Sequence, residues 1–352
     1  MSRTMLHFGA GALGRGLVLP RIADADGTVS IADTDRALVD YIRERGHYRL
    51  VIAGDDGRRE VDVPISNAYA IGRDDEALDA AIAYADIVTT SVQVGNLPRV
   101  VARLAGVWKD AAPRGRMVVG SENLRHVGRH LAELFAAHDG LGGISTPDCV
   151  VDRISAALPQ GFVAETEEYS EWVVEASPAC GMPGPDFADD VDRLFFRKRY
   201  LVNSLADGAS FMGLTRGKLY LHEAMRDEAI LNQMAPLLDL LRAHLAREFG
   251  FDTDDLVAYE ERSVKRLQNP GISRRLDTVA RDPWRKFGPT ERFLEPIIRE
   301  AAAGGDVSEA LKSLAAIIAA AEPDGAARRS QLDAIWTGGP AEQFAAQVAA
   351  GE

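Results

Sequence analysis

Cysteine is scarce in this chain of 352 residues, and its scarcity excludes a disulfide-stapled fold. The two cysteines, Cys149 and Cys180, show no metal-ligand spacing. We therefore expect two free thiols in a reducing compartment and no metal site.

Long apolar runs are missing as well. No segment approaches the ~20 residues that span a bilayer, and a strand is predicted so soon after Met1 that no room is left for a signal peptide. Positive charge is in deficit, because the formal net charge is −13. A surplus of negative charge argues against binding to nucleic acid or to acidic membranes. We expect a cytoplasmic protein with neither kind of partner.

What the sequence does contain is a glycine-rich turn between a predicted strand and a predicted helix. Gly9 allows a tight turn out of the strand, Gly11 lets the backbone approach a pyrophosphate, and Gly14 allows close packing of the helix. This context predicts a dinucleotide-binding site. The glycine turn, as we call it, consists of Gly9, Ala10, Gly11, Ala12, Leu13 and Gly14.

An acidic residue at the end of the second predicted strand selects the cofactor. Asp33 follows the glycine turn by about 20 residues, the usual spacing for a ribose-binding carboxylate. The Asp33 carboxylate can accept hydrogen bonds from both ribose hydroxyls of NAD, whereas it would repel the 2′-phosphate of NADP. The predicted cofactor is NAD, and Thr90 and Ser91, which end the third predicted strand, complete its site.

Up to about residue 125, β-branched runs alternate with helical periods, as a parallel sheet with crossover helices requires. The predicted strands are 5–8, 29–32, 87–91 and 117–120, and the predicted helices are 13–23, 36–45, 76–84 and 97–107. Pro20 is expected to kink or shorten the first helix. Residues 46–63 predict a β-hairpin inserted in the wound sheet, and residues 161–174 predict a further β segment.

A stretch rich in proline and glycine over 177–185 predicts a linker. Helical periods then dominate, over 186–204, 222–249, 308–321 and 326–335. The predicted fold is α/β, with a Rossmann-type doubly wound domain over residues 1–185 and a mainly α-helical domain over residues 186–352. We expect the active site in a cleft between the two domains.

Lys198 and Asn203 open the predicted helical domain. In an α-helix they are offset by about 140°, so they could flank one pocket but not stack. A partly desolvated lysine can act as a general base for an alcohol proton, and an asparagine can donate to the developing oxyanion. The alternative is a solvated helix face, because Lys198 lies in a cluster of three basic residues.

Asn123 follows the fourth predicted strand, where wound α/β domains present their ligand groups. It could polarise the same substrate oxygen. The alternative is a helix N-cap, since asparagine is favoured there.

Segments spread over residues ~5 to ~296 resemble, in order, the polyol-specific long-chain dehydrogenases. Agreement over that length is more specific than any single motif. The matching segments are 7–11, 14–16, 86–90, 121–123, 151–154, 169–172, 269–270, 279–283 and 285–287.

The resemblance implies an NAD-dependent oxidoreductase that interconverts a polyol phosphate and a ketose phosphate, by default mannitol 1-phosphate and fructose 6-phosphate. The family signature has a lysine, an asparagine five positions later and a histidine three positions after that. Lys198 matches the lysine as general base, and Asn203 and Asn123 match the asparagines that shape the oxyanion site. Ala206, followed by Asp207, replaces the histidine, and none of the seven histidines is an obvious substitute.

The stretch from Arg262 to Arg292 carries nine basic residues against three acidic ones. Local positive charge of this size suits an anionic substrate, and arginine can hold a phosphate through two parallel hydrogen bonds. Arg281, Arg285 and Lys286 are the predicted phosphate ligands, because they lie in a segment that resembles the family. The alternative is that these side chains pair with the acidic surface.

Two other functions stay open at this point. Because Ala206 replaces the signature histidine, the substrate could be a different anionic alcohol of a specialised pathway, or the chain could bind NAD and a sugar phosphate without turnover. In each case the partner is a small anionic polyol or sugar phosphate. Nothing in the sequence argues against a monomer.

Overall fold

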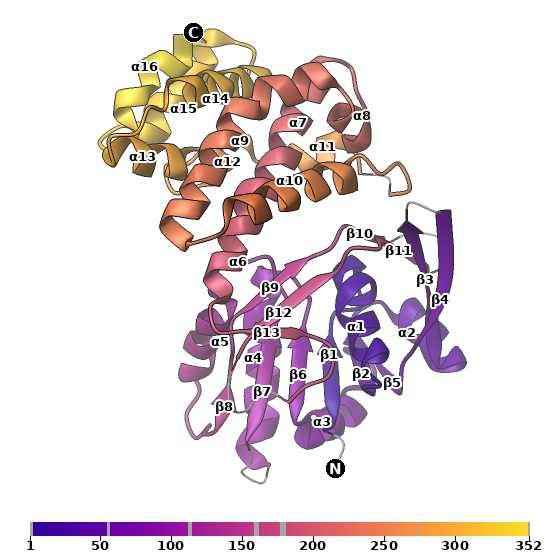
Figure 1. Ribbon diagram of the computed structural model, residues 1–352. Helices are drawn as coiled ribbons and strands as arrows, with labels where there is room; N and C mark the ends of the chain where they lie inside the picture. Colours follow the sequence, from indigo (N-terminus) through magenta and orange to yellow (C-terminus); the bar gives the residue numbers. More distant parts are fainter. Residues whose placement is uncertain are drawn as a thin grey trace. The chain divides into compact units, whose positions relative to one another are not determined.

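In the computed structural model the described residues are 3–54, 57–111, 115–157, 162–176, 181–272 and 274–350. The chain forms two compact units, Met1–Phe195 and Phe196–Glu352 (Figure 1). The predicted division after residue 185 stays a prediction. Cys149 is a buried free thiol, whereas Cys180 and the first part of the predicted linker lie outside the described residues.

The first unit is built on a parallel sheet of six strands, buried on both faces as crossover helices require. Neighbouring strands pair in register, so that Phe8 lies level with Ala32 on one side and Thr90 on the other. In spatial order the strands are β5 (Asn67–Ala70), β2 (Val29–Asp33), β1 (Met5–Phe8), β6 (Ile87–Thr90), β7 (Arg116–Gly120) and β8 (Ile144–Ser145).

Helices follow most strands of this sheet, which confirms the predicted Rossmann-type fold (Figure 1). One helix shows how local sequence sets its ends, since the Asp35 side chain caps it by accepting from Leu38 N–H and Gly46, with φ of 72°, terminates it. The helices are α1 (Leu19–Asp24), α2 (Arg36–Arg45), α3 (Asp75–Tyr84), α4 (Leu97–Asp110) and α5 (Val127–Ala136), with a 3₁₀ turn, η2 (Val94–Asn96), before α4.

The helix predicted over 13–23 begins instead as a π turn, η1 (Gly14–Val18), and continues as α1. Pro20 stands in the first turn of α1, where its missing N–H is tolerated. The first helix therefore departs from a regular α-helix, as expected from Pro20, but it does so through a wider π turn that precedes the proline.

The predicted hairpin belongs to a second sheet, separate from the six-stranded one. Its predicted insertion in the wound sheet was therefore wrong. Its first strand pairs in parallel with a strand more than a hundred residues later, and such long-range pairing leaves no local signal. This second sheet has the order β10 (Ser155–Ala157), β11 (Ala164–Glu167), β3 (His47–Gly54) and β4 (Gly57–Pro64).

A third sheet of three strands completes the first unit. The β segment predicted over 161–174 is divided between the second and third sheets. The third sheet has the order β13 (Asp186–Ala188), β12 (Glu171–Glu175) and β9 (Cys149–Asp152).

The second unit is helical, as predicted. Its central helix is α7, in which every residue from Ser204 to Gly213 is buried and which packs against α8, α9, α11 and α14. After α6 (Val191–Arg197), its elements are the π turn η3 (Lys198–Asn203), α7 (Ser204–Thr215), α8 (Leu221–Met225), α9 (Glu228–Phe249), α10 (Thr253–Leu267), α11 (Leu276–Val279), α12 (Pro283–Lys286), α13 (Leu294–Ala302), α14 (Ser308–Ala321), α15 (Gly325–Trp336) and α16 (Glu342–Ala350).

Two predicted helices were wrong in their limits. The segment 186–204 begins as the strand β13, which pairs with β12. The segment 222–249 is two helices, because Asp227 accepts a hydrogen bond from Ala229 N–H and starts α9 afresh. Helix α14 has the predicted limits.

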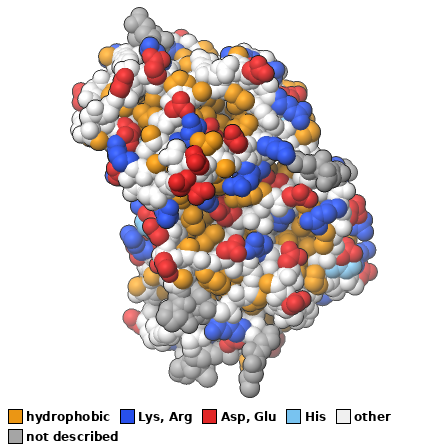
Figure 2. All heavy atoms as spheres, viewed as in Figure 1, with side chains coloured by type: hydrophobic (Ala, Val, Ile, Leu, Met, Phe, Trp, Pro, Cys, Tyr) orange, Lys and Arg blue, Asp and Glu red, His pale blue; other side chains and the backbone are white. Residues whose placement is uncertain are grey.

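Acidic and basic side chains are interspersed over the face drawn in Figure 2. Surface ion pairs of the molecule include Arg73 with Asp40 and Arg103 with Asp79. A helix of the length and apolarity needed to cross a membrane is not found among the described residues.

Candidate functional site

The glycine turn lies at the carboxyl end of β1, where the neighbouring strands also end. Gly9 adopts a φ of +97°, which favours glycine, and its N–H donates to the carbonyl of Ala32 at 2.9 Å. The next residue, Ala10, donates its N–H to the Asp33 carboxylate at 2.6 Å. The turn is thus fixed to the end of β2 by two hydrogen bonds.

Asp33 is oriented by the backbone on both sides of it. Its Oδ2 accepts from Ala10, and its Oδ1 accepts from Asp35 N–H at 2.8 Å. A carboxylate oxygen has more than one lone pair, so both oxygens remain able to accept further hydrogen bonds. The side chain is partly exposed at the end of the sheet, as a ribose-binding carboxylate has to be.

The three motif glycines meet different surroundings. A Cβ added to Gly11 would meet nothing within 4 Å, because this residue faces open space. A Cβ added to Gly14 would lie 2.2 Å from the Gly9 carbonyl oxygen and 2.7 Å from both His7 Nε2 and Ser91 Oγ. Gly14 is therefore required by packing within the turn, whereas Gly11 keeps a space clear outside it. Ala12 and Leu13 start the helix between them, and their side chains are partly buried.

The end of β6 is held by a buried acid that sequence reasoning missed. Glu122 accepts from the Thr90 hydroxyl at 2.9 Å and from Val92 N–H at 3.0 Å, and burial raises the pKa of its carboxyl group. Ser91 donates its hydroxyl to the carbonyl of Gly9 at 2.7 Å. Thr90 and Ser91 therefore lie beside the glycine turn, with Thr90 buried and Ser91 partly exposed.

Two side chains brace the π turn η1, one from β3 and one from the link between β9 and β10. Such a turn leaves carbonyl groups without their usual α-helical donors. Tyr48 donates its hydroxyl to the carbonyl of Arg15 at 2.7 Å, and Arg153 donates to that of Gly16 at 2.8 Å. Arg15 itself is buried and donates to the carbonyl of Ala10 at 2.7 Å. In the sequence, the arginine directly after Gly14 was the only sign of these contacts.

Asn123 follows β7 in an exposed bend. It is not a helix N-cap, because α5 begins at Val127 and His126 occupies the preceding position. The N-cap alternative was therefore wrong, and a role in oxyanion stabilisation stays a prediction.

In the second unit, Lys198 and Asn203 are the first and last residues of the π turn η3. In a π-helix the carbonyl of residue i accepts from the N–H of residue i+5, instead of residue i+4 as in an α-helix. The sequence-based offset assumed an α-helix, so it does not apply to η3. Lys198 and Asn203 are both partly buried.

The position of the missing histidine is a buried alanine followed by a buried acid. Ala206 and Asp207 are both less than a tenth exposed. The Asp207 carboxylate accepts from Lys286 Nζ at 2.8 Å and from Arg292 Nη1 at 2.8 Å. Lys286 also donates to the carbonyl of Val279, and burial lowers the pKa of its amine. Two cations thus share one carboxylate in the interior of this unit.

The other predicted phosphate ligands are exposed. Arg281 donates through Nε to the carbonyl of Thr278 at 3.0 Å, and Arg285 lies 3.4 Å from a carboxylate oxygen of Glu291. The structure does not gather Arg281, Arg285 and Lys286 into one cluster of hydrogen bonds, and their binding of a phosphate stays a prediction. Arg292, which was not singled out, is the cation that joins Lys286 at Asp207.

Replacing Asp207 by asparagine is expected to lower the free energy of unfolding by about 3–5 kcal/mol, because the buried amine of Lys286 and the partly buried guanidinium of Arg292 would lose their shared anion. Urea unfolding followed by circular dichroism measures the loss. The matched control is Asp333→Asn, since Asp333 pairs with Arg329 on the exposed face of α15 and is expected to cost less than about 1 kcal/mol. Equal losses in the two variants would show that Asp207 does not neutralise the buried cations.

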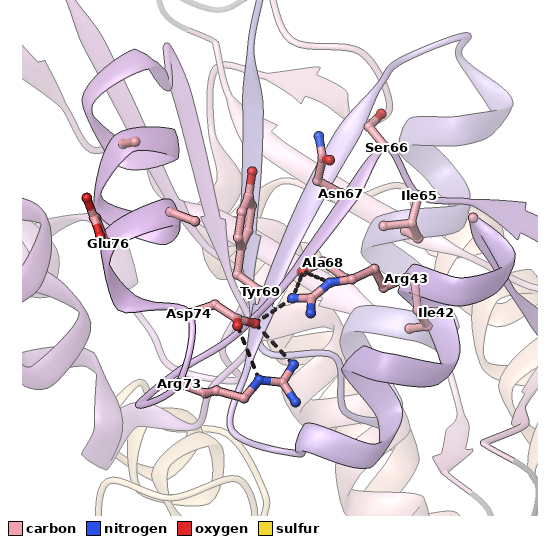
Figure 3. A pocket seen from close by; sticks show the side chains of 13 residues that line it. Ile42, Arg43, Ile65, Ser66, Asn67, Ala68, Tyr69, Arg73, Asp74 and Glu76 are labelled. Carbon is pink, nitrogen blue, oxygen red and sulfur yellow. Dashed lines mark hydrogen bonds and ion pairs between the residues drawn. The ribbon is translucent and has the colours of Figure 1, made fainter.

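The hollow shown in Figure 3 lies at the outer edge of the main sheet, between α2, β5 and α3, and encloses about 760 Å³. None of the predicted site residues lines it. Arg43 and Arg73 both pair with Asp74, and Arg43 and Asp74 also bond the outward-facing backbone groups of Ala68 and Ala70. These side chains cap the free edge of β5, which protects it from pairing with another strand.

Two family models match the chain. Residues 3–182 match the mannitol dehydrogenase Rossmann domain, and residues 190–339 match the mannitol dehydrogenase C-terminal domain. Among curated relatives, mannitol-1-phosphate 5-dehydrogenase of Brevibacillus brevis is 31% identical over 91% of this chain and 87% of its own length. The enzyme of the same name from Anoxybacillus flavithermus is 29% identical over 89% of this chain and 86% of its own length.

Solved structures show the same fold. Mannitol 2-dehydrogenase of Pseudomonas fluorescens, in a ternary complex with NAD and D-mannitol, superimposes with a TM-score of 0.80 at 20% identity, covering 100% of this chain and 91% of that one. A substrate-free D-sorbitol dehydrogenase superimposes with a TM-score of 0.76 at 17% identity, covering 91% of this chain and 80% of that one.

Proposed function

Because the chain belongs to the mannitol dehydrogenase family and is an NAD-dependent polyol dehydrogenase, we propose that it interconverts a polyol phosphate and a ketose phosphate. Mannitol 1-phosphate and fructose 6-phosphate are the default pair, and mannitol 1-phosphate stands in the name of the curated relatives. The proposal concerns the substrate and the roles of the side chains.

The observation that carries the choice of a phosphorylated substrate is a basic segment packed against the π turn of Lys198. Arg199 in that turn donates to the carbonyl of Thr290 at 2.9 Å and pairs with Glu291 at 2.9 Å. These bonds hold Thr290 and Glu291, which lie between Arg285 and Arg292 in the sequence, against the turn that contains Lys198. Because the cations of this segment outnumber its acids, an anionic substrate group would complete the charge balance.

NAD fits the residues of the first unit. The open space over Gly11 and the acceptor oxygens of Asp33 suit a pyrophosphate and a ribose, respectively. Ala10, Thr90 and Ser91 would line the same site. When bound, NAD supplies the acceptor for the hydride that leaves the alcohol carbon.

The proton follows a separate route through side chains. Lys198 would take the hydroxyl proton as the hydride leaves and would return it in the reverse direction. Asn203, the last residue of η3, and Asn123 would donate hydrogen bonds to the oxygen as it becomes negative, without titrating themselves. Ala206 offers a methyl group where the family has an imidazole, so these three side chains carry the proposed chemistry.

The proposal is tested by following NADH absorbance with ketose and aldose phosphates, fructose 6-phosphate among them, each beside its unphosphorylated counterpart. We expect turnover with a phosphate and kcat/KM at least about tenfold lower without it, since a charge-assisted hydrogen bond contributes about 1.5–3 kcal/mol. Binding of NADH and sugar phosphate without turnover would favour the non-catalytic alternative. Faster turnover of an unphosphorylated sugar would contradict the phosphorylated substrate, whereas preference for another anionic ketone would favour the alcohol of a specialised pathway.

Two glycine variants separate cofactor contact from packing. Gly11→Ala is expected to leave the thermal midpoint unchanged but to weaken NADH binding about tenfold or more, because its Cβ enters the open space where the pyrophosphate approaches. Gly14→Ala is expected to lose about 1–3 kcal/mol of stability, because its Cβ would overlap the Gly9 carbonyl. Thermal unfolding and fluorescence titration with NADH measure both effects. The same loss of affinity and stability in the two variants would contradict the separation.

A further inference from the structure

His7 is a fully buried polar residue in the middle of β1, where apolar side chains are the rule. The register of β1 and β6 places it directly opposite Thr89, and its Nδ1 lies 2.7 Å from Thr89 Oγ1. Its Nε2 lies 2.8 Å from the carbonyl oxygen of Gly9 and 2.9 Å from Ser91 Oγ. Both ring nitrogens therefore have partners, and the partners of Nε2 belong to the predicted cofactor site.

The partners fix the tautomer of the imidazole. A carbonyl oxygen can only accept, so the hydrogen bond to Gly9 requires the proton on Nε2. Nδ1 is then an acceptor, and the Thr89 hydroxyl donates to it. Burial lowers the pKa of His7 to about 4, so the ring is neutral at physiological pH and keeps this arrangement.

The Gly9 carbonyl is the point where these contacts meet. It accepts from both His7 Nε2 and Ser91 Oγ, at 2.8 Å and 2.7 Å. These two hydrogen bonds fix the Gly9 carbonyl and thereby hold Gly9 at its positive φ. After Gly9 the chain turns so that Gly11 faces open space. Gly14 packs directly against the same atoms, since a Cβ on this residue would overlap them.

We propose that His7 is a positioning residue for the cofactor, which holds the glycine turn in its pyrophosphate-binding shape through the Gly9 carbonyl and couples the turn to Ser91. The proposal rests on the proposed function, in which the glycine turn binds NAD. His7 touches no reacting atom, so its effect falls on cofactor affinity.

The test compares His7→Leu, which removes the hydrogen bonds of both ring nitrogens, with His7→Gln, whose amide nitrogen can donate to Gly9 in place of Nε2. His130→Leu on α5 is the matched control. We expect His7→Leu to raise the Kd of NADH about fivefold to tenfold, as the loss of a buried hydrogen bond implies, and to leave the KM of the sugar phosphate within about twofold. His7→Gln should restore NADH affinity to within about twofold of the wild type.

An unaltered Kd in folded His7→Leu, or a Kd in His7→Gln as high as in His7→Leu, would overturn the proposal. Failure of the wild type to bind NADH would instead overturn the proposed function. A second measurement uses the wild-type protein and therefore does not depend on the folding of a core variant. The ¹⁵N NMR spectrum of the wild-type imidazoles is expected to show His7 neutral and protonated on Nε2 at pH 6, and a proton on Nδ1 would contradict its bond to Gly9.

Discussion

Lys198→Met is expected to lower kcat by about two to four orders of magnitude while NADH still binds, because the variant has no group to take or return the alcohol proton. Methionine keeps much of the length of lysine and loses the amine, so the helix turn η3 should persist. Steady-state kinetics with the sugar phosphate, beside a fluorescence titration with NADH, separates chemistry from cofactor binding.

The matched control for this variant is Lys312→Met on α14, where the amine pairs with Glu309 at the surface. Lys312→Met should keep wild-type turnover. A smaller variant, Lys198→Ala, leaves room for a small primary amine, which should restore part of the lost rate if proton transfer is the role of Lys198. Wild-type turnover in Lys198→Met would remove this residue as the base.

Asp33→Asn is expected to shift the ratio of kcat/KM for NADH over NADPH about 10- to 100-fold toward NADPH. The carboxylate contributes charge-assisted hydrogen bonds to the ribose hydroxyls, each about 1.5–3 kcal/mol, and its charge opposes a 2′-phosphate. The substitution removes both effects. The amide oxygen can still accept one of the backbone hydrogen bonds from Ala10 or Asp35.

Asp35→Asn is the control, because it removes the same charge two residues away, where the side chain caps α2. It should leave the cofactor ratio within about twofold of wild type. An unchanged ratio in Asp33→Asn would contradict the assignment of Asp33 as the ribose-binding residue.

The elements that local sequence signals specify were predicted closely. Strand β1 and helix α2 have the predicted limits, since an apolar run ends at Gly9 and a capping aspartate and a terminating glycine bound α2. The glycine turn was recognised from the spacing of its glycines between a predicted strand and a predicted helix. The pairing of β3 with β11 was missed, because contacts between segments so far apart depend on the whole fold.

The candidate site residues stay predictions, and the geometry around them was open to sequence reasoning only in part. Lys198 and Asn203 were singled out from their spacing and from the family resemblance, but the extra residue that makes η3 a π turn leaves no periodic signal, so the α-helical offset assumed between them does not apply. The ion pairs of Asp207 with Lys286 and Arg292 join residues 79 and 85 positions apart. An acid on the apolar face of α7 was the available sign that a buried cation had to exist nearby.

The most direct measurement is the transfer of deuterium from NADH that carries two deuterium atoms on the reactive carbon of the nicotinamide. With fructose 6-phosphate as acceptor, mass spectrometry of the product should show one deuterium on the carbon that has become the alcohol, with the phosphate retained. Reduced product without deuterium, or oxidation of NADH without a reduced sugar phosphate, would contradict hydride transfer between NAD and a polyol phosphate by this chain.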